Sequence, residues 1–176
     1  MSGSAPAIDT PRTRLRAHRA GDYDACVALW SAPAVTRFIG GKPSTPQQTW
    51  SRLLAYAGHW ALLGYGYWAI EDRETGAYLG ELGFADFKRD VVAAMRGVPE
   101  LGYALVPAAH GRGLGTETVR AAVAYADAHV ASRRTVCAIA PENAPSLAVA
   151  RACGYAAFDR GAIGGAASLF LERIRP

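Results

Sequence analysis

The segment from residue 100 to residue 130 constrains the fold most strongly, because it joins a strand to a long helix through a glycine-rich turn. Residues 100–106, ELGYALV, are apolar enough for a buried strand, and Pro107 ends it because proline cannot donate to a strand ladder. After the turn, apolar residues recur at helical spacing, at Leu114, Val119, Ala122, Val123, Ala126 and Val130. This segment predicts an α/β protein.

The rest of the chain supplies further strands and helices. Residues 66–70, 78–84 and 100–106 are strand-like runs separated by a turn and a loop, and they predict an antiparallel meander. Other elements are expected in this order: a strand at 14–19, a helix after Asp22, a helix from 45 to about 62, a strand at 135–139, a helix at 145–152 and strands at 155–160 and 167–174.

The chain is long enough for one domain with a substantial core. It has 176 residues, of which 51% are hydrophobic, and a chain of this size buries roughly 70% of the surface that it exposes when unfolded. Residues 1–12 are rich in Ser, Ala, Pro and Thr and have little to bury, so we expect a flexible lead-in there. A single domain is expected over residues 13–176.

Composition argues against several classes of protein. The net charge is only +4 without a basic run, which favours a small acidic ligand over nucleic acid. No apolar stretch approaches the roughly 18 residues of a membrane span, and no signal peptide is recognisable, so a cytoplasmic protein is expected. The three cysteines are too widely spaced for a zinc site, so no metal is expected. Only two of the 19 basic residues are lysines and alanine is abundant, a codon bias that points to a bacterium with a GC-rich genome.

The turn His110-Gly111-Arg112-Gly113-Leu114-Gly115-Thr116-Glu117 carries the strongest chemical signal. Its glycines let the backbone approach a ligand, and the first amides of the following helix lack intrahelical partners, so the turn can bind a phosphate. A tight connection without a ligand is the alternative interpretation. A P-loop is excluded because no lysine follows the glycines, and a dinucleotide fingerprint fails because its third glycine position holds Thr116.

This turn and a second segment resemble the GNAT superfamily of N-acetyltransferases. After Pro107, the turn is similar to the acyl-CoA pyrophosphate loop of that superfamily, with His110 in place of the usual Gln or Arg. The segment 141–146, PENAPS, and its helix ending in Gly-Tyr resemble the Asn-x-x-Ser helix of the ribosomal-protein-alanine (RimJ/RimL-type) branch. The resemblance covers nearly the whole chain after residue 12.

The resemblance implies a mixed, mostly antiparallel sheet with helices on both faces, splayed between the strands before and after the long helix. It implies acetyl-CoA as cosubstrate, with pantetheine in the gap between those two strands. The cofactor-binding residues that it implies are the backbone of Leu105 and Val106, the turn residues Gly111, Arg112, Gly113, Leu114, Gly115 and Thr116, and the side chains of Asn143 and Ser146.

Asn143 and Ser146 also admit local interpretations. Asn143 precedes a helix that Pro145 is expected to begin, a position where asparagine commonly caps. In the resembling branch, Ser146 is the candidate general acid for the departing thiolate, but its hydroxyl could simply bond the backbone. Many superfamily members carry a tyrosine where this chain has Ala150. The direct proton donor is therefore expected to be Ser146, or water.

Two carboxylates are candidates for the base that an amine nucleophile requires. Glu81 lies in an apolar run between two glycines and is preferred over Glu100, which begins a strand, although both could be strand-edge charges. We also expect Phe38, Trp68 and Phe84 to line an acceptor pocket, although aromatic residues in strands are more often core. The loop 88–99 is expected to overhang the acceptor side.

The resemblance, together with these residues, implies an acetyl-CoA-dependent N-acetyltransferase. An amine, either a protein N-terminus or a small molecule, is expected to attack the thioester directly in a ternary complex. A backbone N–H near Val106 is expected to polarise the thioester carbonyl. The alternative is a non-catalytic module that binds or senses acyl-CoA, because a phosphate turn reports binding only. Either a monomer or a homodimer is compatible with the sequence.

Overall fold

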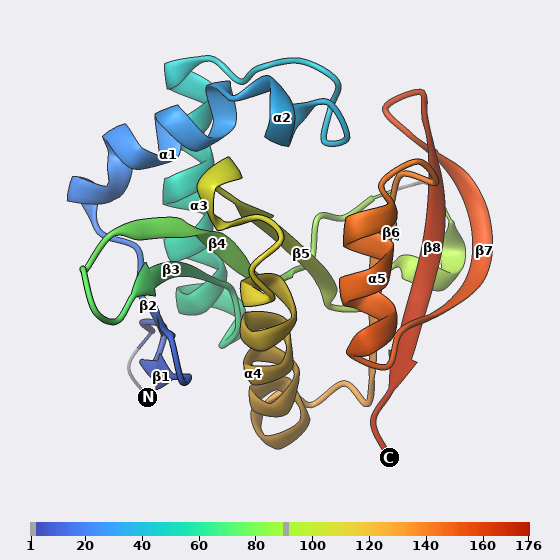
Figure 1. The fold of residues 1–176 in the computed structure, drawn as a ribbon. Helices are drawn as coiled ribbons and strands as arrows, with labels where there is room; N and C mark the ends of the chain where they lie inside the picture. Colours follow the sequence, from blue (N-terminus) through green and yellow to red (C-terminus); the bar gives the residue numbers. More distant parts are fainter. Residues whose placement is uncertain (1–2, 90–91) are drawn as a thin grey trace.

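The computed structural model describes residues 3–89 and 92–176, and its strands form one open sheet (Figure 1). The order is β1-β2-β3-β4-β5-β6-β8-β7, and every neighbouring pair is antiparallel except β5 and β6. The strands are β1 (Ile8–Asp9), β2 (Thr13–Arg16), β3 (Tyr67–Asp72), β4 (Tyr78–Ala85), β5 (Glu100–Leu105), β6 (Arg134–Ile139), β7 (Ala156–Ile163) and β8 (Ala166–Ile174). The expected mixed, mostly antiparallel α/β fold is confirmed.

Helices cover both faces of this sheet. They are α1 (Tyr23–Ser31), α2 (Pro33–Thr36), α3 (Pro46–Leu63), α4 (Leu114–His129) and α5 (Ala144–Ala152). The short helix α2 is an addition to the predicted elements. In Figure 1, α3 runs behind β3 and β4 while α4 runs in front of them. Because side chains alternate along a strand, Glu81 of β4 points toward α1 and α3, whereas its neighbour Leu82 packs in the core with α4.

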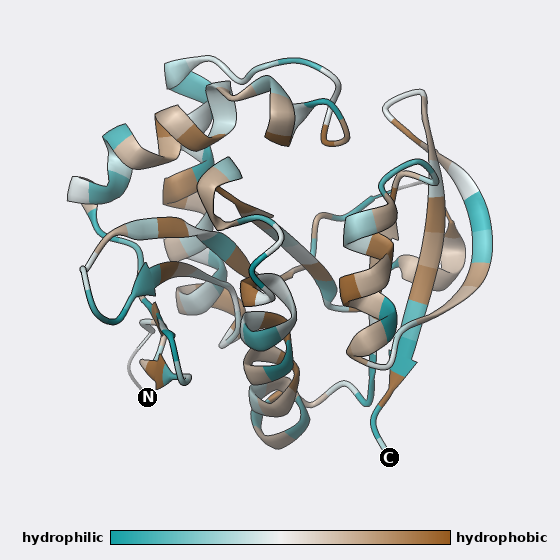
Figure 2. Ribbon diagram, in the orientation of Figure 1, coloured by the Kyte–Doolittle hydropathy of each residue, from teal (hydrophilic) through white to brown (hydrophobic). Residues whose placement is uncertain are grey.

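The main core lies between the sheet and α4. The apolar stripe predicted for this helix is buried there, including Leu114 and Val119 at 1% and 0% exposure. Trp68 and Phe84 are also fully buried in this cluster. Figure 2 shows apolar residues along the sheet strands and a mixture of polar and apolar residues along α4, as expected for a helix with one face against the core.

The sheet splits between β5 and β6. One register pair, Glu100 with Val136, joins the two strands in the described residues, and the N–H of Val136 donates to the carbonyl of Pro99 over 3.0 Å. Beyond this pair the strands diverge, with α4 beginning beside β5 and α5 packed beside β6 (Figure 1). The splayed sheet implied by the resemblance is therefore present.

The N-terminal segment is attached to the sheet, so the expected flexible lead-in is wrong for residues 5–12. Ile8 pairs with Leu15, and Asp9 pairs with Arg14. The indole of Trp68 donates to the carbonyl of Pro6 over 2.8 Å. Composition missed this attachment because it depends on pairing with β2 and on the packing of Ala5 and Ile8 against the core, which a short segment without periodicity does not reveal. Residues 1 and 2 lie outside the described residues.

Within residues 3–89 and 92–176, none of the helices combines the length and the apolar character needed to cross a bilayer.

Candidate active site

The glycine turn before α4 has a backbone that favours glycine at two positions. Gly111 has φ of 70° and Gly113 has φ of 75°, both in the left-handed region. Gly113 is the N-cap residue of α4, and the N–H of Glu117 donates back to its carbonyl over 3.1 Å. The amides of Leu114, Gly115 and Thr116 therefore begin the helix without intrahelical acceptors. The turn has the geometry of an anion-binding loop, which is the role that the sequence predicts for residues 111–116.

Arg12 joins this turn from the N-terminal segment. Its Nη1 donates to the carbonyl of Arg112 over 2.8 Å, and its Nε pairs with the Glu117 carboxylate over 2.7 Å. Thr10 donates to the same carboxylate over 2.6 Å. The ion pair offsets the negative charge of Glu117, which would otherwise repel an anion at the first turn of α4. Sequence analysis missed Arg12, because nothing local distinguishes one arginine in a segment without periodicity.

A pocket of about 520 Å³ opens beside the splay and gathers all three predicted catalytic residues. Glu81 and Glu100 line it from the sheet, Asn143 and Ser146 from α5 and its N-cap, and Phe38 from the segment after α2. Its further lining is largely aromatic and charged, and includes Trp30, Arg52, Tyr56, His59, Tyr67, Asp86, Phe87, Arg89 and Tyr103.

Two of the three predicted acceptor-pocket residues are placed elsewhere. Trp68 and Phe84 are both 0% exposed and pack in the core on the α4 side of the sheet, whereas the described pocket lining includes Phe38 alone of the three. The physical reason is strand alternation. Glu81 faces α1 and α3, so Phe84, an odd number of residues away on the same strand, faces the opposite side, and Trp68 pairs with Leu82 on that same opposite face.

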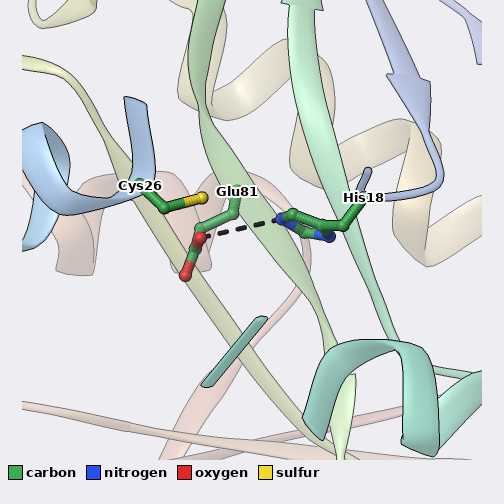
Figure 3. A group of neighbouring side chains, drawn as sticks. All are labelled: His18, Cys26 and Glu81. Carbon is green, nitrogen blue, oxygen red and sulfur yellow. Dashed lines mark ion pairs between the residues drawn. The ribbon is translucent and has the colours of Figure 1, made fainter. Parts of the chain in front are cut away.

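Glu81 is the most constrained of the predicted catalytic residues. Its side chain is 1% exposed, and one carboxylate oxygen, Oε1, accepts hydrogen bonds from the Trp30 indole, over 2.9 Å, and from the Tyr56 hydroxyl. The other oxygen, Oε2, accepts from the Tyr78 hydroxyl over 3.0 Å and lies 3.7 Å from Nε2 of His18 (Figure 3). Three neutral donors from α1, α3 and β4 therefore hold the carboxylate in one orientation.

A thiol and an imidazole complete the surroundings of this carboxylate. Ligand atoms of His18, Cys26 and Glu81 all lie within 4.8 Å of one another (Figure 3). The Cys26 thiol donates to the Tyr78 hydroxyl over 3.4 Å, and burial raises its pKa to about 12, so it stays protonated near neutral pH. Both ring nitrogens of His18 are buried without a hydrogen-bond partner in the described part of the chain. The three side chains thus form a packed polar group centred on Glu81.

Glu100 has a different environment from Glu81. It is 8% exposed and forms an ion pair with Arg89, with 2.8 Å between Nε and Oε2. In the described residues, Glu81 is held by neutral hydroxyl and indole donors, whereas Glu100 is paired with a permanent positive charge. The two candidate carboxylates thus differ in the charge of the partners that hold them.

Asn143 and Ser146 make the local contacts that their positions allow. The Asn143 side-chain oxygen accepts from the backbone N–H of Ser146 over 3.3 Å, so Asn143 does cap α5. This contact uses only Oδ1 and leaves the amide nitrogen as a donor toward the pocket that Asn143 lines. The Ser146 hydroxyl donates to the Tyr103 hydroxyl over 2.9 Å, a partner that the sequence did not reveal.

The backbone of Leu105 and Val106 differs from the expectation. The N–H of Val106 donates to the carbonyl of Leu79 over 2.9 Å, so it is not available to polarise a thioester. The Leu105 carbonyl lies 2.9 Å from His110 Nε2. Because backbone groups alternate sides along a strand, the N–H of Leu105, and not that of Val106, points toward the gap beside β6.

Comparison with known proteins agrees with this architecture. Residues 12–156 match the family described as Acetyltransferase (GNAT) domain. The fold is similar to that of a protein from Bordetella pertussis described as a GNAT-family acetyltransferase, with a TM-score of 0.84 and 31% identity over 96% of this chain and 99% of that chain. A ribosomal-protein-S5-alanine acetyltransferase from Vibrio fischeri shares the fold at 16% identity, with a TM-score of 0.74 and 97% of each chain covered.

A curated relative supports the same assignment. The uncharacterized N-acetyltransferase p20 of Bacillus licheniformis is 27% identical over 139 residues, which cover 78% of this chain and 75% of that protein. The matching domain spans most of the chain and contains the glycine turn, the splay and the pocket. The chain therefore belongs to the GNAT family and is an acetyltransferase.

Proposed function

We propose that this enzyme transfers the acetyl group of acetyl-CoA to a primary amine by direct attack in a ternary complex. The observation that carries the proposal is one pocket, at the splay between β5 and β6, that is lined by both Glu81 and Ser146. Glu81 reaches it from the α1 and α3 face of the sheet, and Ser146 reaches it from α5. A base and a hydroxyl donor thus meet at one opening from opposite sides.

The remaining predicted residues would bind either acetyl-CoA or the amine acceptor. The amides of residues 111–116 would bind the pyrophosphate at the positive end of α4, and the Arg112 side chain would add charge. The unpaired edge of β5 at Leu105 and the amide of Asn143 would hold the pantetheine arm. The acceptor would enter beside Phe38, on the side where Glu81 can remove its proton.

The acceptor is a primary amine on a protein N-terminus or on a small molecule. The pocket joins carboxylates to aromatic rings, a combination that attracts a cationic amine before it is deprotonated. An extended N-terminus and a small amine both fit this chemistry. The loop 88–99 would border the entrance, but its residues 90 and 91 lie outside the described residues.

Calorimetric titration tests the cofactor. Acetyl-CoA is expected to bind, whereas NAD and ATP are not, and dephospho-CoA serves as a probe of the ribose phosphate. Gly113→Pro should abolish binding, because proline requires φ near −65° where this position has 75°. Gly164→Pro, in the distant β7–β8 hairpin at φ of 57°, is the matched control and should bind normally.

Thiol release tests the reaction. Acetyl-CoA is incubated with a panel of peptides bearing free N-termini and a panel of small amines, and free CoA is measured. We expect turnover with members of one panel, which names the acceptor class. Tight binding of acetyl-CoA without turnover on either panel would favour the non-catalytic module, and no binding at all would overturn the proposed function.

A further inference from the structure

Tyr103 of β5 and Ser146 of α5 bridge the gap at which the sheet splits. The Ser146 hydroxyl donates to the Tyr103 oxygen over 2.9 Å, and the Tyr103 hydroxyl donates to the Ser146 carbonyl over 2.7 Å. We propose that Tyr103 is the residue that protonates the departing CoA thiolate, with Ser146 supplying the replacement proton from solvent. This inference rests on the proposed function.

The direction of the two hydrogen bonds carries the assignment. In this arrangement the Ser146 hydroxyl gives its hydrogen to the phenol oxygen, so a proton can pass from Ser146 to Tyr103. The Tyr103 hydrogen points to a carbonyl and can swing away by rotation about its C–O bond, because hydroxyl rotors adapt to their partners. Sequence analysis expected Ser146, or water, as the direct donor, whereas here Tyr103 takes that role and Ser146 lies between Tyr103 and solvent in the relay.

The side chain of Tyr103 lies on the opposite face of the sheet from Glu81, a position that suits a general acid paired with Glu81 as general base. Its neighbour Ala104 pairs with Glu81 in the β4–β5 register, and strand alternation turns the Tyr103 side chain to the other face, toward α5. Glu81 and Tyr103 therefore line one pocket from opposite faces of the sheet. Such an arrangement lets the amine lose a proton on one side while the thiolate gains one on the other.

Burial keeps Tyr103 in its acidic form. Removal from water raises the pKa of its phenol, an effect that the hydrogen bond from Ser146 only partly opposes, so the phenol is protonated throughout the neutral range. Ser146 is only half-buried, and its hydroxyl can exchange protons with solvent. The pair thus connects a buried donor to water through one hydrogen bond.

The proton and electron balance is as follows. As the tetrahedral intermediate collapses, the C–S bond breaks and its electron pair stays on sulfur. Sulfur takes the proton of the Tyr103 hydroxyl, the phenol oxygen takes the proton of the Ser146 hydroxyl, and water reprotonates Ser146. The proton that the amine nitrogen gives up through Glu81 returns to solvent, so acetyl-CoA and amine become CoA and amide without any net change in protons.

Kinetics of single variants test this order. Tyr103→Phe should lower kcat about 100-fold, the lower range for loss of a general acid, with KM for acetyl-CoA nearly unchanged. Ser146→Ala should cost only about threefold to tenfold, because water can take over a relay position. Tyr155→Phe is the control, since it deletes another buried phenol hydroxyl, one that bonds Thr135 away from the pocket, and it should leave kcat unchanged.

Two kinetic results would overturn the proposal. A larger loss in Ser146→Ala than in Tyr103→Phe would make Ser146 the direct donor. A rise in KM for acetyl-CoA at constant kcat in both variants would show that the Tyr103–Ser146 contact only shapes the binding site.

A binding measurement tests the same contact without an acceptor. The ionisation of the thiol of bound CoA is followed by thiolate absorbance across pH, with the protein alone as reference. A phenol that donates to sulfur stabilises the thiolate, so the thiol pKa should be higher in Tyr103→Phe than in the wild type and in Tyr155→Phe. Equal values in all three would overturn the role of Tyr103 while the proposed function stands, whereas failure of the wild type to bind CoA would overturn both.

Discussion

Nη1 of Arg12 donates a hydrogen bond of 2.8 Å to the carbonyl oxygen of Arg112, a residue 100 positions later in the chain. This contact ties the N-terminal segment to the glycine turn. The same guanidinium pairs with Glu117 in the first turn of α4. The start of the domain is thus part of the predicted cofactor site.

Arg12→Ala is expected to weaken acetyl-CoA binding about fivefold to tenfold. The substitution frees the Glu117 carboxylate beside the phosphate site and loosens the turn, and the effect is moderate because Arg12 is half-exposed. Calorimetric titration measures the change. Arg14→Ala is the matched control, since Arg14 lies on the same segment but pairs with Asp9, and unchanged affinity in both variants would exclude a role for Arg12.

Glu81→Gln is expected to lower kcat about 100-fold while acetyl-CoA affinity stays the same. The amide keeps the shape of the carboxylate and can still accept from Trp30, but it cannot take up a proton. Glu100→Gln should cost less than about fivefold, because that carboxylate is already paired with Arg89. Steady-state kinetics on both variants decide between the two bases, and the reverse order of effects would assign the role to Glu100.

Asp22 should make folding stability depend on pH in the acid range. Burial opposes ionisation of this carboxyl, but hydrogen bonds from the Arg16 guanidinium and the Arg19 amide outweigh it and lower its pKa below 3.8. Because the folded pKa is below the unfolded value, the stabilisation is complete above about pH 4 and is lost as pH falls through the folded pKa.

Asp22→Asn is therefore expected to cost about 3 kcal/mol of unfolding free energy near pH 7, because it removes one of the two carboxylates that pair with the buried Arg16 and leaves Glu71 as the other. The difference from the wild type should be smaller at about pH 2, because the stabilisation by the carboxylate declines as pH falls below the unfolded pKa and through the folded pKa. Urea unfolding at the two pH values measures it. Asp9→Asn removes an exposed pair and should change stability little at either pH, and a pH-independent loss in Asp22→Asn would contradict the mechanism.

Trp68→Ala and Phe38→Ala are expected to have different effects, because Trp68 is a core residue and Phe38 lines the pocket. Trp68 is fully buried and bonds Pro6, so its loss should cost about 3–5 kcal/mol of unfolding free energy. Phe38 lines the pocket, so its loss should raise KM for the amine about threefold to tenfold with little effect on unfolding. Denaturant unfolding and kinetics on both proteins measure these effects. A changed amine KM in a folded Trp68→Phe variant would restore Trp68 to the acceptor site.

Much of the fold follows from short-range patterns. The stripe that begins at Leu114 predicts α4, Pro107 ends the strand before it, and Thr45 caps α3 with its side chain accepting from the N–H of Gln48. These features depend on neighbours within about four residues, which a sequence displays directly. The segment 8–9 was missed because a two-residue strand has no measurable period, and its stability comes from pairing with β2.

For the candidate site, the sequence predicted which residues take part but not which residues contact them. Residue type and local motif selected Glu81, Glu100, Asn143 and Ser146, which the structure brings to one pocket. Their partners were not predictable, because Trp30 is 51 residues from Glu81 and Tyr103 is 43 residues from Ser146. Trp68 and Phe84 were misplaced because a strand pattern separates two faces without saying which face bears the pocket.

By itself, the sequence determined the order of elements, the glycine turn and the set of candidate side chains, since each is written in local spacing and residue type. The tertiary structure alone decided which strand face became core, that Arg12 joins the turn, and that Tyr103 and Ser146 meet across the splay. The physical reason is that sheet register and helix packing bring together residues from distant parts of the chain, and no periodicity encodes those pairs.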